Sequence, residues 1–98
     1  MKGAKDILFY EDTIKDINEF IIMKHEEEKT EEINSSWLNK VLAECKECLG
    51  ISRGSDKDKC IESYINIWFI TLLEYVVAKV EFTLLDVADE TLNLMKMI

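Results

Sequence analysis

The three cysteines and the single histidine of this 98-residue chain are the first candidates for chemistry. Cys45 and Cys48 form a CxxC pair, and Cys60 with His25 would complete a Cys₃His set of the type that binds zinc. Zinc sites usually hold such a pair on a turn. Here the spacing puts both cysteines on the apolar face of a helix, near its C-terminal end, where the helix dipole does not favour a thiolate. We predict structural cysteines, with a metal site or a Cys48–Cys60 disulfide as the alternatives.

The other polar residues do not form a catalytic set. His25 stands beside Glu26 with no serine or cysteine in a nucleophile motif, which predicts a solvated histidine near a helix end. Glu74 is the one carboxylate within apolar sequence. We expect it to act either as a buried switch or as the ion-pair partner of Lys79. The sequence has no phosphate-binding glycine loop, HExxH, ExxH or EF-hand motif. We therefore expect no enzymatic activity and no cofactor or metal.

Glycine and proline mark the boundaries of the elements that would carry these residues. Proline is absent, and two of the three glycines lie within residues 50–56. Gly50 suits a left-handed helix end, and Ser55, with Asp58 three residues on, suits a helix N-cap. One helix is therefore expected to end at Leu49 and another to begin at Asp56.

Upstream of this boundary, apolar residues recur three and four apart, which predicts two amphipathic helices. The first runs from Ala4 or Asp12 to Lys24, and the second ends at Leu49. Their apolar stripes contain Ile7, Tyr10, Ile14, Ile17 and Ile21 in the first helix, and Ile33, Trp37, Leu38, Val41, Leu42, Cys45, Cys48 and Leu49 in the second.

The polar residues 25–32 separate these two helices. They lack apolar periodicity, so they form either a solvated extension of the first helix or a loop. Thr30 is a reasonable N-cap for the second helix, because Glu31 and Glu32 would then lie at the positive end of its dipole. Ser35 or Ser36 is the competing cap.

The last 43 residues carry conflicting local signals. Residues 79–84 alternate apolar and polar side chains, as a half-buried strand does. The absence of glycine and proline argues against a hairpin, and polar residues three and four apart over a longer window favour helix. We expect helices from Asp56 to Ala78 and from Glu81 to Lys96, fused or separated. The predicted fold is one all-α domain, residues 1–98: a small bundle of three to four helices, the last long and bent or broken near residues 78–82.

Residues 64–82 are apolar enough to suggest a membrane span. Glu74 would lie near the centre of that span, where a carboxylate costs about 2.5 kcal/mol or more, and Lys79 and Glu81 follow closely. We predict a central helix buried on most sides instead. Such a helix needs neighbours on nearly all sides, so we favour a homodimer over a monomer, with Tyr64, Trp68, Leu72 and Tyr75 as the oligomerisation surface.

The net charge of −8 indicates the kind of partner. Arg53 is the only arginine, so we expect no direct binding to nucleic acid, whose phosphates need clustered cations. An acidic surface attracts basic proteins instead, although the charge alone would also keep a small domain in solution. The short apolar run from Ile7 to Tyr10 predicts no secretory signal, and the odd cysteine count favours a reducing cytoplasm, or the host cytosol if the protein is viral.

Small size, acidity and the lack of a catalytic set together predict a protein-binding module. We expect it to block a larger protein, as an inhibitor, antitoxin, immunity protein or virus-encoded anti-defence protein does. Aromatic residues usually anchor such contacts, here beside a run of carboxylates. The predicted partner-binding residues are Glu26, Glu27, Glu28, Glu31, Glu32 and Trp37. The alternative is a structural or assembly adaptor that oligomerises through its apolar C-terminal half.

Overall fold

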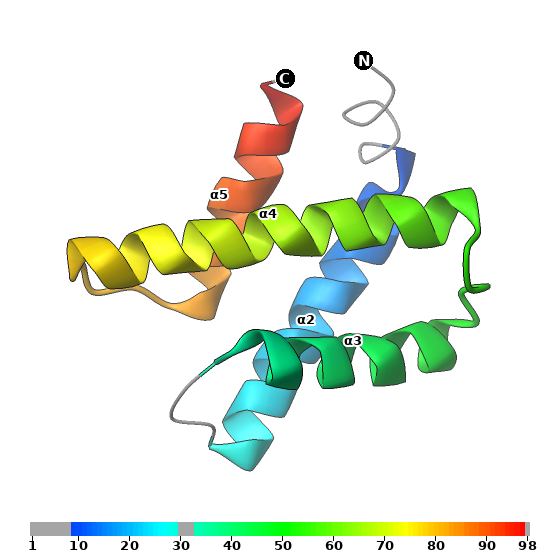
Figure 1. The fold of residues 1–98 in the computed structure, drawn as a ribbon, viewed down its shortest axis with the longest axis horizontal. Helices are drawn as coiled ribbons and strands as arrows, with labels where there is room; N and C mark the ends of the chain where they lie inside the picture. The colour runs from blue at the N-terminus through cyan, green and yellow to red at the C-terminus, as the bar shows by residue number, and fades with distance from the viewer. Residues whose placement is uncertain (1–8, 30–32, 98) are drawn as a thin grey trace.

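A computed structural model describes residues 9–29 and 33–97, and this part of the chain contains four α-helices and no strand (Figure 1). The helices are α2 (Glu11–Glu28), α3 (Ser35–Leu49), α4 (Asp56–Ala78) and α5 (Leu84–Lys96). The all-α prediction is confirmed, and the last two helices are separate elements rather than one bent rod. The strand alternative for residues 79–84 is excluded.

Helix α2 carries the predicted isoleucine stripe. Ile14, Ile17 and Ile21 are buried, while the charged residues between them face outward. The helix continues past the predicted end at Lys24, so the first half of the polar run is a helix extension. Lys29 ends it with a φ of 50°. The alternative start at Ala4 lies outside the described residues.

Helix α3 begins with a cap that the sequence analysis did not select. The side chain of Asn34 accepts a hydrogen bond from the backbone N–H of Trp37 at 2.9 Å. Ser35 and Ser36 therefore lie inside the helix, and Thr30 is outside the described residues. The buried residues of α3 are Leu38, Val41, Leu42 and Cys45. Cys48 and Leu49, predicted on the same apolar face, are exposed because the last turn extends beyond the core.

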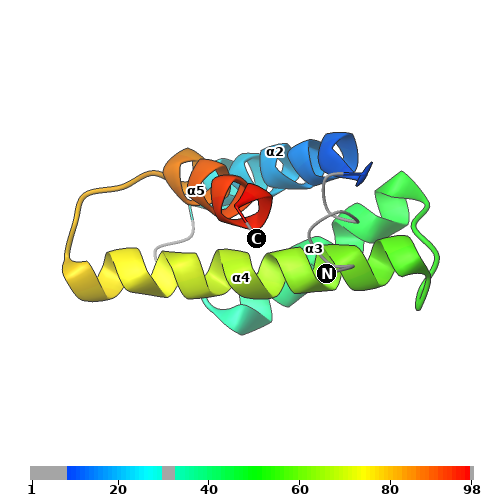
Figure 2. The same ribbon diagram turned by 90° about the horizontal axis from the view of Figure 1, so that it is seen from above.

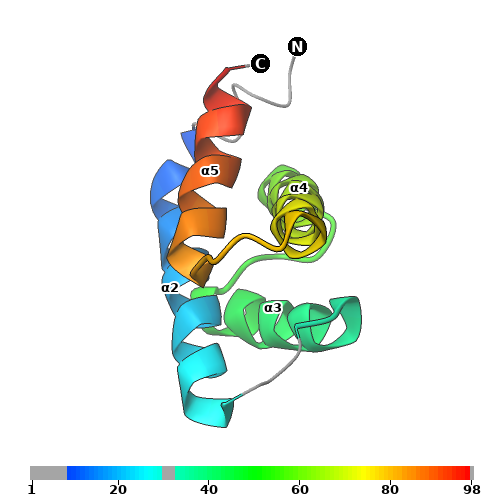
Figure 3. The same cartoon turned by 90° about the vertical axis from the view of Figure 1, so that its left-hand side faces the viewer.

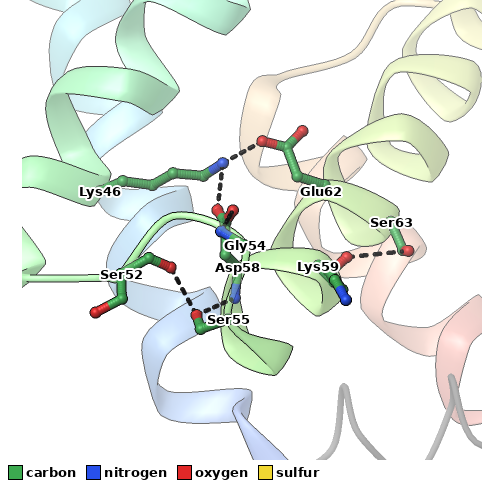
Figure 4. Close-up of polar contacts among 8 residues, drawn as sticks. All are labelled: Lys46, Ser52, Gly54, Ser55, Asp58, Lys59, Glu62 and Ser63. Atoms are coloured by element: carbon green, nitrogen blue, oxygen red, sulfur yellow. Dashed lines mark hydrogen bonds and ion pairs between the residues drawn. The ribbon is translucent and has the colours of Figure 1, made fainter.

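The connection from α3 to α4 follows the predicted capping pattern (Figure 4). Gly50 ends α3 with a φ of 68°, and the hydroxyl of Ser55 accepts from the backbone N–H of Asp58 at 3.1 Å. The Asp58 carboxylate accepts from the backbone N–H of Gly54 at 2.9 Å, and it pairs with Lys46 of α3 at 2.6 Å. This ion pair fixes the end of α3 to the start of α4.

Helix α4 is the central element, and its inner face holds the largest buried side chains, Tyr64 and Trp68. It ends at Lys79, whose φ is 56°. The next helix starts with a capping box, in which the Thr83 hydroxyl accepts from the Asp86 N–H while the Asp86 carboxylate accepts from the Thr83 N–H. The predicted break is thus confirmed, with α5 starting at Leu84 rather than Glu81.

The helices form two layers. Figures 2 and 3 show α2 and α5 side by side in one layer, with α3 and α4 in the other and crossing them at a steep angle. The layers share one hydrophobic core to which all four helices contribute. At its centre, the amide of Asn18 in α2 donates to the Tyr64 hydroxyl at 2.9 Å, and that hydroxyl lies 3.3 Å from the carbonyl oxygen of Ala88 in α5.

Candidate functional site

An apolar groove of about 890 Å³ opens where the C-terminal half of α4 meets the start of α5 and the end of α2. Figure 3 views the molecule from the side on which α4 ends and α5 begins. The groove is lined by Ile22, His25 and Glu26 of α2, by Ile33, by Leu72, Leu73 and Val76 of α4, and by Phe82, Thr83, Leu84 and Leu85. Most of this lining is aliphatic or aromatic, as in sites that bind apolar ligands or partner side chains.

The groove exists because α4 is long and α2 and α5 cross it rather than run along it. With 1.5 Å per residue, the 23 residues of α4 span about 34 Å, whereas the 13 residues of α5 span about 20 Å. The last turns of α4 therefore extend past the elements that cover its first half (Figure 1). Leu73 remains 45% exposed, Val76 55% and Leu85 57%, although all three are apolar.

Four side chains with aromatic rings lie in or beside the groove. Phe82 stacks on Tyr75 with ring centroids 5.2 Å apart, and the Tyr75 hydroxyl donates to the Glu90 carboxylate. His25 is half-buried and meets Trp37 edge-on at 6.4 Å. Its Nδ1 atom is buried without a hydrogen-bond partner among the described residues. His25 lies in the last turn of α2, as predicted, but its ring is half-buried against Trp37 of α3 rather than fully solvated.

The predicted acidic surface is only partly at the groove. Glu26 lines it, whereas Glu27 and Glu28 are exposed beside it at the end of α2. Trp37 is half-buried and donates its indole N–H to Glu28 at 2.7 Å, so it secures α3 to α2. Glu31 and Glu32 lie outside the described residues.

The described segments that line the groove carry a net negative charge. Residues 22–29 contain three carboxylates and two lysines, and residues 72–85 contain two carboxylates and one lysine, which gives −2 in total. Lys24 is also engaged by Glu44 of α3 at 3.5 Å, which leaves the carboxylates of the first segment in larger excess.

The predicted oligomerisation residues lie mostly in the core of the single chain. Tyr64, Trp68 and Leu72 are buried, and Tyr75 is half-buried. They therefore offer little surface to a second copy. The sequence could not separate the two faces of α4, because apolar residues occur all round its C-terminal half. The uncovered residues are Ile70, Leu73, Val76 and Val77, and Glu74 among them is exposed rather than buried.

A second, polar hollow of about 650 Å³ lies between α3 and α4. Its carboxylates from Asp58 and Glu62 both pair with the Lys46 ammonium (Figure 4). Burial opposes the charge of Lys46, but these two partners raise its pKa overall, and Lys46 and the Gly54 N–H lower the pKa of Asp58. Because these charges pair with one another across the joint between two helices, we interpret this hollow as structural.

The cysteines do not gather into a reactive site. Cys45 is buried and Cys48 is exposed, and both are free thiols, so the Cys48–Cys60 disulfide is not formed. Burial is the main cause that raises the pKa of Cys45 to about 11, which disfavours the thiolate. Among residues 9–29 and 33–97, no three His, Cys, Asp or Glu side chains lie close enough to hold a metal ion.

One described helix, α4, is long and apolar enough to cross a membrane, with a mean hydropathy of 1.3 over its most apolar stretch. The core helix of a globular protein meets the same criterion. Ile61, Tyr64, Ile65, Trp68 and Leu72 of α4 are buried against the other helices. Its exposed apolar residues are concentrated in the second half, at and beside the groove.

The groove was not predicted from the sequence. Leu73, Val76 and Leu85 look like core residues in a linear pattern, and the way in which the helices cross leaves them uncovered. No protein-family model, curated protein or solved structure matches the chain, so its function is inferred from the geometry and charge of this site.

Proposed function

We propose that this protein is a non-catalytic binding module that seats an apolar segment of a larger protein in the groove and thereby blocks that protein. The observation that carries the proposal is the half-exposed apolar wall formed by Leu73, Val76 and Leu85. Contiguous exposed apolar surface of this kind usually marks an interaction site. Covering it would contribute about 25 cal/mol for each Å² removed from water.

The groove suits a protein partner better than a small metabolite. It has few polar residues to orient a compact polar ligand: Glu26, His25, whose Nδ1 atom is buried, and Thr83, whose hydroxyl already caps α5. Its walls come from three helices and continue onto the exposed end of α4. A partner side chain could fill the groove while the neighbouring surface of α4 supplies further contact area.

Affinity capture from a native lysate with matched variants tests this proposal. Leu85→Asp puts a carboxylate into the groove wall, and it should preserve α5 because the first helical turn favours negative charge. We expect this variant to lose the proteins that the unmodified chain retains. Val76→Gln should also lose them, whereas Val77→Gln, one residue along but outside the groove, should keep them. Identical captured proteins for all forms would refute a role for the groove.

A second candidate function, assembly through self-association, is favoured by one further observation. Ile70, Leu73 and Val77 follow one another three and four residues apart on the outer face of α4, and Val77 is 80% exposed. An antiparallel pair of such seams could join two copies. Sedimentation equilibrium separates the functions: a dimer that Ile70→Gln and Val77→Gln dissociate supports assembly, and a monomer at all concentrations excludes it.

A further inference from the structure

We infer that the groove receives an amphipathic α-helix of the partner, with lysine or arginine flanking its apolar stripe. This inference rests on the proposed function, because it specifies the segment that the proposed protein partner inserts. It requires two separate arguments, one for helical structure and one for positive charge.

The helical structure follows from backbone hydrogen bonding. An extended peptide usually adds to the exposed edge of a sheet, which satisfies its backbone N–H and C=O groups. The described part of this chain has no strand, and the groove walls are mainly side chains of Leu73, Val76, Phe82 and Leu85. A segment entering such an apolar surface must satisfy its own backbone groups, and an α-helix does so internally.

The positive charge follows from the residues around the groove. Glu26 is part of its wall, and the described segments that supply the lining carry −2. Cationic side chains at the edges of the inserted helix would be attracted to these carboxylates, which would speed association and fix the orientation. A second copy would bring the same negative segments and a further −8, so charge disfavours it as the occupant. Anionic lipid is disfavoured for the same reason.

Synthetic peptides test both arguments on the full chain. The reference probe is a peptide of about 15 residues with leucines spaced for one helical stripe and lysines on either side. A second peptide replaces the lysines by glutamates, and a third places proline in the centre to break the helix. We expect each change to weaken binding by about tenfold or more in a calorimetric titration. The advantage of lysine should shrink as salt is added.

Charge-reversed variants locate the contact. Glu26→Lys and Glu27→Lys change the net charge equally, and both lie in the last turn of α2, where a cation is compatible with the helix dipole. Only Glu26 lines the groove, so Glu26→Lys should weaken the lysine peptide several-fold more than Glu27→Lys. Val76→Gln should likewise weaken binding of the lysine peptide more than Val77→Gln does. Circular dichroism should confirm that each variant keeps its helices.

The possible failures are distinguishable. Equal affinity for the lysine and glutamate peptides would overturn the basic partner, and equal affinity for the proline peptide would overturn the helix. Equal effects of Glu26→Lys and Glu27→Lys would place the cation away from the groove wall. Displacement of the peptide by neutral lipid vesicles would assign the groove to a membrane, and a dimer dissociated by Leu85→Asp would assign it to a second copy. The proposed function itself falls only if lysate capture is insensitive to Leu85→Asp.

Discussion

At the scale of single residues, the Tyr64 hydroxyl joins three helices. It accepts from the Asn18 amide of α2 and lies within hydrogen-bond distance of the Ala88 carbonyl oxygen of α5. The side chains of Asn18 and Tyr64 are both buried, so neither can replace its hydrogen-bond partner with bulk water. This contact positions α2 and α5 across α4, and those three helices supply most of the groove.

Tyr64→Phe should therefore destabilise the fold by more than the hydroxyl's own hydrogen bond, because its partner is left behind. The Asn18 amide would remain buried with its donor unsatisfied, which typically costs about 1–3 kcal/mol. Urea denaturation followed by circular dichroism measures the effect. Tyr75→Phe is the control. Tyr75 is only half-buried and its partner Glu90 can form hydrogen bonds with water instead, so we expect a smaller loss of stability. Equal losses for the two variants would contradict the structural role of the Asn18–Tyr64 contact.

At the scale of elements, the end of α4 determines the shape of the groove. Lys79 adopts left-handed backbone angles, φ 56° and ψ 35°, which glycine tolerates better than residues with a Cβ atom. The chain then runs through three residues to Thr83, where the capping box of α5 begins. Phe82 lies in this connection and packs on Tyr75, so the connection also forms one wall of the groove.

Lys79→Gly should stabilise the protein by about 0.5–1 kcal/mol, because the left-handed conformation no longer opposes a side chain. Lys59→Gly is the matched control on the same helix. Lys59 is exposed within α4, so glycine there should cost about 1 kcal/mol. Thermal unfolding of the two variants should show shifts of opposite sign. A decrease for both would indicate that Lys79 makes a compensating contact.

At the scale of the whole molecule, two buried groups, the Tyr64 hydroxyl and the Cys45 thiol, make the free energy of unfolding decrease at alkaline pH. Burial raises the pKa of Tyr64 to about 12 from 10.0 and is the largest cause that raises the pKa of Cys45 to about 11 from 9.0. Both folded-state pKa values lie above the unfolded ones. The associated stability is thus complete below the unfolded pKa and is lost as pH rises toward the folded pKa.

We expect the free energy of unfolding to fall between about pH 9 and 12, by at most about 1.4 kcal/mol per pH unit for each group between its two pKa values. Urea titrations at a series of alkaline pH values measure this slope. The Tyr64→Phe variant is the control, since it removes the Tyr64 contribution and should flatten the curve above about pH 10. An unchanged slope in that variant would show that Tyr64 ionises as readily in the folded protein as in the unfolded chain.

The sequence by itself determined the helical class and most boundaries of the helices. These features depend on local physics: the spacing of Ile14, Ile17 and Ile21, the left-handed end at Gly50, and the hydroxyl cap at Ser55. A bend or break near residues 78–82 was also predicted, and α4 ends there at Ala78. Local signals failed where several caps competed, as at Asn34, and where an extended connection mimicked a strand.

Only the tertiary structure decided which apolar residues are covered. In sequence, Trp68 and Val76 belong to the same hydrophobic run, yet Trp68 is buried in the core and Val76 lines an open groove. The difference comes from the crossing of the two layers, because the last turns of α4 extend beyond that crossing. No periodicity within α4 encodes these relations, since burial depends on what the rest of the chain places beside each residue.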